Sequence, residues 1–278
     1  MFFERDGVKL AFDDTGTPPG SGRTAVLFLH GLGDDRSTWR RFVESLSRER
    51  RVVTLDFRGH GRSAHPAGVY AFADYVADAI WLCDELVRAP VVAVGHSLGG
   101  AVALTVAQTR PELVAGLMLE DPPLYQDGRG AAPPFFSLLR DFTLQMQARQ
   151  ATIEEYEATL AVTPAGNGEG SMAEVLGAER VRARADGLAR LDPEVFSPAI
   201  EGDGLEDVRP DDPVSCPVLV LRADPALGAV FGEEDERRFR TAHPGACVTV
   251  VAGASHLLHD EQPDRFASEL EAFLSALG

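Results

Sequence analysis

Runs of apolar residues recur along the chain, and the stretches between them carry apolar residues at three- and four-residue spacing. Several runs are continuously apolar, a pattern typical of parallel strands that are covered on both faces. At the start of the chain, Asp6-Gly7 lies between two apolar stretches and predicts a tight hairpin turn. We expect further strands at residues 25–29, 52–55, 91–94, 113–119, 218–221 and 248–251.

Helical spacing fills most of the gaps between these strands. Strands that alternate with helices predict a doubly wound α/β fold with a mostly parallel sheet. The crossovers between parallel strands should be right-handed. The expected helices cover residues 38–47, 73–87, 98–108 and 266–277.

Residues 122–213 break the alternation. They contain helical patterns at 135–146, 153–160 and 172–191, a glycine-rich break at 166–170, and no convincing strand. We therefore predict an α/β core made of residues 1–121 and 214–278. The intervening residues 122–213 are expected to form an inserted helical lid over the carboxyl ends of the strands.

The most informative short motif is Gly95-His96-Ser97-Leu98-Gly99, which follows an expected strand and opens an expected helix. In this strand–turn–helix context, G-x-S-x-G places a serine hydroxyl on a sharp, strained bend. Glycine on either side removes side chains that would clash there. The sequence therefore predicts that Ser97 is a nucleophile, beside a helix N-terminus that favours developing negative charge.

A serine hydroxyl needs a base within hydrogen-bonding distance, and histidine is suited to that role near neutral pH. His256 is the best candidate, because it follows the last strand in a Gly-Ala-Ser turn and comes after Ser97 in the chain. The other histidines are His30, His60, His65, His96, His243 and His259.

Four motifs of the chain resemble those of the α/β-hydrolase superfamily, and they occur in the same order as in that family. The chain looks like its lidded esterase, lactonase and C–C hydrolase members over nearly its whole length outside the insertion. The resemblance implies an eight-stranded, mostly parallel sheet with an inserted helical lid. The motifs are His30-Gly31-Leu32-Gly33, the stretch Asp56–Ser63, Gly95-His96-Ser97-Leu98-Gly99 and Gly253-Ala254-Ser255-His256.

The resemblance also implies roles for particular residues. The backbone amides of Leu32 and Leu98 would form an oxyanion hole. The histidines of the turn motifs would make structural hydrogen bonds. The stretch Asp56–Ser63 lacks the lysine of a phosphate-binding loop, so we expect it to be structural, with Arg58 in a buried ion pair.

The acid that orients His256 has two candidate positions in the family. Most members carry it in a G-x-x-D turn after the penultimate strand, but here Asp224 falls two residues early and Ala226 takes the usual place. Other members carry the acid after the strand that follows the nucleophile helix, which matches Asp121. We favour Asp121 and keep Asp224 as the alternative.

A serine at this bend argues against haloalkane dehalogenases and epoxide hydrolases, whose relatives use aspartate there. We predict a serine hydrolase that cleaves a small or medium hydrophobic carboxylic ester or lactone through an acyl-enzyme. A C–C bond hydrolase of the meta-cleavage type and a low-turnover ligand-binding relative are the alternatives. Candidate pocket residues are Trp39, Tyr125, Phe135, Phe136, Phe142 and Met146.

Composition narrows the partners further. The 278 residues carry 26 Lys and Arg against 43 Asp and Glu, a net charge of −17, which disfavours nucleic acid and anionic membrane surfaces. No metal-ligand spacing such as H-E-x-x-H occurs, so we expect no metal and no cofactor. Three scattered cysteines and a charged start without a signal-peptide pattern favour a cytoplasmic protein. We expect a small-molecule hydrophobic substrate as its partner, and a monomer or homodimer.

Overall fold

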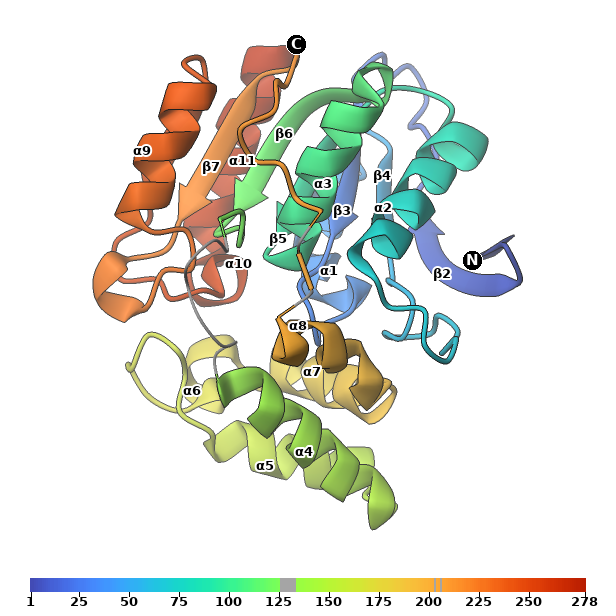
Figure 1. Ribbon diagram of the computed structural model, residues 1–278, viewed down its shortest axis with the longest axis vertical. Coiled ribbons are helices and arrows are strands. Elements are labelled where there is room, and N and C mark those ends of the chain that lie inside the picture. The colour runs from blue at the N-terminus through green and yellow to red at the C-terminus, as the bar shows by residue number, and fades with distance from the viewer. Residues whose placement is uncertain (126–133, 203, 206) are drawn as a thin grey trace.

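The fold is built on one central β-sheet (Figure 1). Within residues 1–125, 134–202, 204–205 and 207–278, which the computed structural model describes, eight strands form it in the order β1-β2-β4-β3-β5-β6-β7-β8. The strands are β1 (Phe2–Arg5), β2 (Val8–Asp14), β3 (Ala25–Leu29), β4 (Val52–Leu55), β5 (Val91–His96), β6 (Val114–Glu120), β7 (Val218–Arg222) and β8 (Cys247–Val250).

Pairing in the sheet is antiparallel only at one edge. β1 pairs with β2, and β2 pairs with β4, in antiparallel register. The other neighbours, from β4 through β8, are parallel. Asp6 and Gly7 both have positive φ between β1 and β2, as a tight hairpin turn requires. The predicted hairpin and the mostly parallel α/β class are therefore confirmed.

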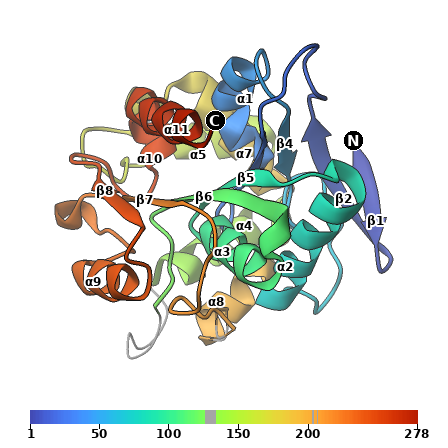
Figure 2. The ribbon, with the colours of Figure 1, turned by 90° about the horizontal axis from the view of Figure 1, so that it is seen from above.

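Helices cover both faces of the sheet (Figure 2). The side chains of β3 alternate between two apolar clusters, one on each face of the sheet. Val26 and Phe28 are buried in one cluster, and Leu27 and Leu29 are buried in the other. On the side of Val26 lie α1 (Arg40–Leu46) and α11 (Pro263–Leu277); on the side of Leu27 lie α2 (Phe72–Trp81), α3 (Leu98–Thr109) and α9 (Glu233–Ala242).

Short helices complete this core. They are η1 (Arg36–Trp39), η2 (Leu82–Val87), η3 (Pro111–Leu113), η5 (Pro225–Leu227) and α10 (Leu258–Glu261).

Among the described residues, no helix is long and apolar enough to cross a membrane.

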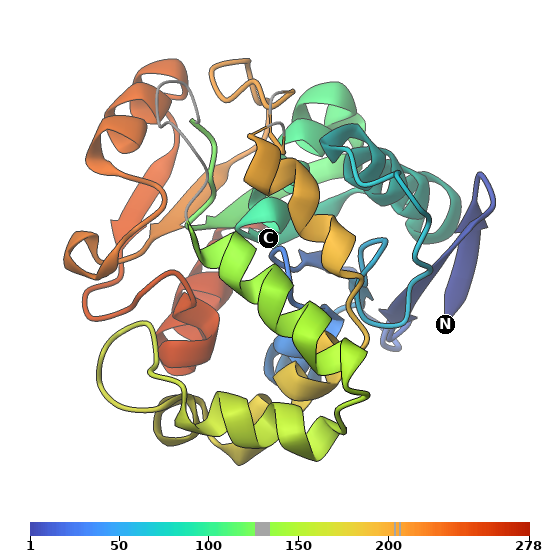
Figure 3. The same cartoon turned by 60° about the horizontal axis from the view of Figure 1, so that its bottom comes forward.

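The described residues between β6 and β7 form a helical segment at the end of the sheet toward which β6 and β7 point (Figure 1), and Figure 3 turns it toward the viewer. Within its described residues, the only strand-like pairing is an isolated bridge between Pro164 and Ser171. The use of this segment as a lid remains a prediction. Its helices are α4 (Pro134–Ala148), α5 (Ile153–Val162), α6 (Met172–Leu176), α7 (Ala178–Ala189), η4 (Pro193–Phe196) and α8 (Ser197–Glu201).

Local signals set the helix boundaries in this segment. Thr152 and Ser171 each accept a hydrogen bond from the backbone amide of the third helical residue, a glutamate whose carboxylate accepts one from the backbone amide of the cap residue. These capping boxes satisfy amides that would otherwise lack partners. Gly177, with φ of 80°, separates α6 from α7 within the stretch 172–191 that the sequence predicts as one helical region.

Candidate active site

Ser97 lies on a strained bend between β5 and α3. Its backbone has φ of 51° and ψ of −117°, a conformation that costs on the order of 1–3 kcal/mol for a non-glycine residue. The flanking glycines are required by close backbone contacts. A Cβ on Gly95 would lie 2.2 Å from the carbonyl oxygen of Gly99, and a Cβ on Gly99 would lie 2.2 Å from that of Leu29. The bend presents the Ser97 side chain at the carboxyl end of β5.

His256 and Asp121 are joined by a hydrogen bond of 2.7 Å between Nδ1 and Oδ2. Asp121 is fully buried directly after β6, with φ of 40°. Its carboxylate also accepts hydrogen bonds from the backbone amides of Val230 and Phe231, at 2.9 and 3.1 Å. Because these amides fix the carboxylate, the His256 ring has a fixed partner for Nδ1.

Asp224 has a different arrangement. Its two carboxylate oxygens accept from the amides of Ala226 and Gly253, at 2.9 and 2.8 Å. These backbone hydrogen bonds lower the pKa of Asp224. Both oxygens therefore serve the turns that follow β7 and β8, and the structure pairs His256 with Asp121 instead.

His96 links the bend of Ser97 to the turn of His256. Its Nε2 lies 2.9 Å from the carbonyl oxygen of His256, and the two rings are 4.6 Å apart between centroids. Within the described residues, no hydrogen bond joins the Ser97 hydroxyl to His256, and the hydroxyl does not cap α3. The contact between Ser97 and His256 therefore remains a prediction.

The turn His30-Gly31-Leu32-Gly33 lies against Ser97. A Cβ on Gly31 would be 3.3 Å from the Cβ of Ser97. The amide of Gly33 donates to Nε2 of His60 at 3.1 Å, and burial lowers the pKa of His60 to about 3. A neutral His60 can accept this hydrogen bond, so it holds the turn in place. The use of the Leu32 and Leu98 amides as an oxyanion hole remains a prediction.

The loop Asp56–Ser63 contains the buried ion pair that was expected for Arg58. Arg58, only 2% exposed, donates from Nε and Nη2 to the two carboxylate oxygens of buried Asp78, at 2.7 and 2.8 Å. Burial would lower the pKa of Arg58, but Asp78 outweighs it and the pKa is raised. This fork geometry fixes the loop beneath the turn of Gly33.

A buried charged cluster beside the site was missed by the sequence analysis. His259 is fully buried, and its Nδ1 lies 2.8 Å from both carboxylate oxygens of Glu120, the residue before Asp121. Burial would lower the pKa of His259, but the negative charges of Glu120 and Asp260 outweigh it and raise the pKa. The sequence signal was present, because a second acid precedes Asp121 and a second histidine follows His256 by three residues.

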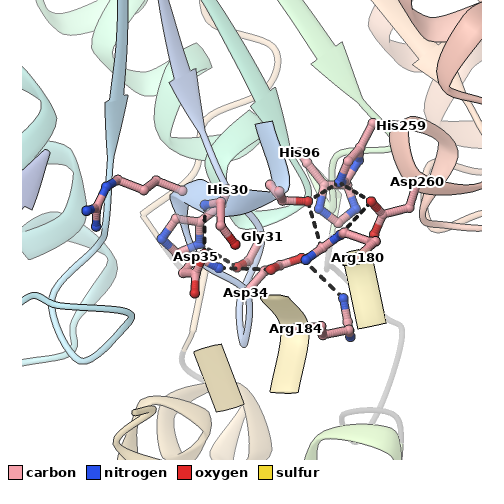
Figure 4. Close-up of polar contacts among 12 residues, drawn as sticks. His30, Gly31, Asp34, Asp35, His96, Arg180, Arg184, His259 and Asp260 are labelled. Carbon is pink, nitrogen blue, oxygen red and sulfur yellow. Dashed lines mark hydrogen bonds and ion pairs between the residues drawn. The ribbon is translucent and has the colours of Figure 1, made fainter. Parts of the chain in front are cut away.

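The same cluster contains the one group of possible metal ligands among the described residues, Asp34, His259 and Asp260. Figure 4 shows Arg180 of α7 among these side chains. Arg180 donates to Asp34 at 2.6 Å and to Asp260 at 2.7 Å, so a guanidinium already neutralises both carboxylates. A metal ion there would face that positive charge, and the donor set fits an ion-pair cluster better than a metal centre.

Of the candidate pocket residues, Trp39 was placed wrongly. It is fully buried on the α1 side of the sheet, with its ring 4.9 Å from Phe28 and 5.8 Å from Phe266. Its apolar surface is buried by packing in the core. Tyr125 is also buried, and its hydroxyl donates to Asp211 at 2.7 Å.

The other candidates lie on α4. Phe136 stacks on Phe196 of η4 at 6.1 Å, whereas Phe142 meets Tyr156 of α5 edge-on at 5.8 Å, and both contacts are internal to the helical segment. Met146 is buried and Phe135 is 55% exposed. Their role in a pocket remains a prediction.

Leu139 of α4 and Phe196, which the sequence analysis did not select, lie close to the turn of Gly33. A Cβ on Gly33 would lie 3.0 Å from Phe196 and 3.3 Å from Leu139 of α4. The helical segment therefore places apolar side chains directly over the turn beside Ser97. A separate hollow of about 460 Å³ is charged, with Arg36, Asp56 and Asp186 in its wall, and includes neither Ser97 nor His256.

Curated relatives match the chain over different extents. A putative 2-succinyl-6-hydroxy-2,4-cyclohexadiene-1-carboxylate synthase of Bacillus subtilis is 26% identical and aligns over 98% of this chain and 97% of its own length. Other relatives, at 37% identity, align with 41% of this chain. The aligned part covers about a third of the length of those relatives.

Solved structures resemble the whole chain. The N-formylmaleamic acid deformylase of Pseudomonas putida S16 superposes with a TM-score of 0.78 at 19% identity, covering 97% of this chain and 99% of its own. A thermophilic esterase from Thermogutta terrifontis gives 0.71 at 26% identity, covering 99% and 97%. The family model of the alpha/beta hydrolase family matches residues 26–269. With this match, and with the sheet and bend described above, the chain belongs to the alpha/beta hydrolase family.

Proposed function

We propose that the protein is a serine hydrolase that cleaves a small or medium hydrophobic carboxylic ester or lactone. The observation that carries the proposal is the 2.7 Å hydrogen bond between Asp121 and His256, formed beside a serine held at φ of 51°. This pairing supplies an oriented base, and the bend supplies the hydroxyl of a half-buried serine.

In the proposed reaction, His256 takes the proton of Ser97 as Oγ attacks the substrate carbonyl carbon. The amides of Leu32 and Leu98 donate to the oxygen that becomes negative. Collapse of the intermediate breaks the bond to the leaving alkoxide, which receives the proton from His256. A water molecule then attacks the acyl-enzyme by the same route, releases the carboxylic acid and restores Ser97.

Two features support an uncharged acyl group. Leu139 and Phe196 pack over the turn of Gly33, which gives the site an apolar cover. Arg180 and Arg184 of α7 both pair with Asp34, at 2.6 and 3.1 Å, so their charges are already compensated. In this proposal, residues 122–213 act as the lid, and the esterase relative from Thermogutta terrifontis supports the ester as substrate.

The test is turnover of a graded panel of esters and lactones, combined with labelling by a fluorophosphonate. We expect hydrolysis of apolar acyl groups and one adduct per chain, on Ser97. Turnover of ring-cleavage dienones without any ester hydrolysis would select C–C bond hydrolysis instead. Tight binding of apolar ligands with no turnover of any substrate would select the ligand-binding alternative.

A further inference from the structure

One arginine of the helical segment contacts a residue that follows each turn of the candidate active site, Asp34 after Gly33 and Asp260 in α10 after His256 (Figure 4). Nη2 of Arg180 donates to Asp34 at 2.6 Å, and Nε donates to Asp260 at 2.7 Å. Asp34 directly follows Gly33, and its amide donates to the carbonyl of Gly31. Asp260 lies four residues after His256. The guanidinium therefore bridges the proposed oxyanion turn and the turn that carries the proposed base.

The bridge is shielded from water. The side chains of Arg180, Asp34 and Asp260 are 13%, 6% and 5% exposed. Burial would raise the pKa of Asp34, but the charges of Arg180 and Arg184 outweigh it and lower the pKa. In such surroundings, a charge that loses its partner is poorly compensated, so the geometry of the group is strongly constrained.

A chain of buried hydrogen bonds extends the bridge to β6, the strand that ends just before Asp121. Nη2 of Arg180 also donates to Oγ1 of Thr38 at 2.8 Å, and Thr38 lies 2.6 Å from Nε2 of His259. Nδ1 of His259 contacts Glu120, whose carboxylate also accepts from the His259 amide at 2.9 Å. The order carboxylate, imidazole, hydroxyl repeats that of Asp121, His256 and Ser97. Glu120, His259 and Thr38 are too buried for a substrate to reach. This chain of hydrogen bonds therefore supports the two turns and does not itself react with the substrate.

A second tie keeps the helical segment in place independently of Arg180. The carboxylate of Glu261 accepts from the Ser255 amide at 2.7 Å and from the Asn167 amide at 3.2 Å. Asn167 belongs to the loop between α5 and α6. Loss of Arg180 alone should therefore alter the spacing of the two turns without releasing the segment.

We propose that Arg180 is a positioning residue, which sets the distance between the oxyanion turn and the turn of His256 for the reaction at Ser97. The inference rests on the proposed function. The helical segment is then a working part of the catalytic machinery as well as its cover, because the two turns are correctly spaced only when α7 is docked. A displacement of about 1 Å at such a site can cost about 100-fold in rate.

The test compares Arg180→Met with Arg182→Met in the full chain. Arg182 lies on the same helix, is 46% exposed and pairs with Glu154 and Glu157 away from the site. The concentration of active sites is titrated with a fluorophosphonate, so that kcat is expressed per reactive serine. For Arg180→Met we expect kcat to fall about 10- to 100-fold with KM changed less than about threefold. Arg182→Met should match the wild type.

Two further variants keep the test decisive if Arg180→Met does not fold. Arg180→Lys keeps the charge but lacks the planar fork that reaches both carboxylates, so kcat should remain low. Asp260→Asn removes one arm of the bridge and should lower kcat per site in the same way. Equal kcat per titrated serine in wild type, Arg180→Lys and Asp260→Asn would overturn the proposal, because Arg180 would then affect only the amount of folded protein.

The wild type separates this inference from the proposed function. If wild-type protein neither labels at Ser97 nor turns over any substrate, the proposed function fails and this inference fails with it. If the wild type is active and Arg180→Met has the same kcat per titrated site, the inference alone fails.

Discussion

Asp121 and His256 lie 135 positions apart in the chain, yet Oδ2 of one and Nδ1 of the other are 2.7 Å apart. The parallel strands β6 and β8 flank β7 and end on the same side of the sheet, which brings the residues after them together. In the proposed mechanism, this contact at Nδ1 leaves Nε2 of the imidazole to accept a proton.

The first prediction separates the two candidate acids. Asp121→Asn should lower turnover by about 10³- to 10⁴-fold, because an amide no longer selects the required tautomer of His256. Asp224→Asn should change turnover by less than about tenfold, because Asp224 only caps backbone amides outside this pair. Steady-state kinetics on the best ester measures both, and urea unfolding checks that each variant is folded. The reverse ranking would assign the acid to Asp224.

A second prediction concerns the bend at Ser97. Gly95→Ala should destabilise the protein by about 3 kcal/mol or more, because the new methyl group would press on the backbone of Gly99 at 2.2 Å. Gly245→Ala is the control, because a Cβ there meets nothing within 4 Å, and its effect should stay within about 0.5 kcal/mol. Urea denaturation gives both free energies of unfolding. Equal stability of the two variants would show that the bend is not tightly packed.

The third prediction is a pH dependence that belongs to His60. Its pKa is about 3 in the folded protein and about 6.5 in the unfolded chain, so below pH 6.5 only the unfolded chain binds the proton. The free energy of unfolding should therefore fall with decreasing pH by about 1.4 kcal/mol per unit from this group. His60→Gln lacks this contribution, so the stability advantage of the wild type should shrink between pH 6.5 and 4.5.

Urea unfolding of both proteins at four pH values across that range measures the difference. Other titrating groups are shared by the two proteins and cancel. A stability difference that is constant with pH would mean that His60 is not held neutral against the Gly33 amide.

Much of the fold could be predicted from sequence, because parallel strands between two helical layers must be apolar on both faces. The runs at 25–29 and 52–55 coincide with β3 and β4, and the run at 248–251 is offset by one residue from β8. The bend of Ser97 was equally readable, since its glycines are required by local contacts. Local patterns report local constraints well.

The charged cluster could not be predicted in the same way. Arg180 meets Asp34 and Asp260 across 146 and 80 positions, through the docking of α7 onto the core. Nothing in the sequence around Arg180 distinguishes it from the exposed Arg182 two residues later. The assignment of Trp39 to the pocket was wrong for a related reason. Sequence alone does not distinguish an aromatic residue that packs in the core from one that lines a pocket, and in the structure Trp39 packs on Phe28.

The most direct test of the central claim is mass spectrometry of the intact, folded protein after treatment with a fluorophosphonate. The account predicts one adduct per chain, mapped to Ser97, with none on Ser97→Ala and much slower formation on His256→Ala. A folded wild-type protein that gains no adduct at Ser97, or labels as fast without His256, would contradict it.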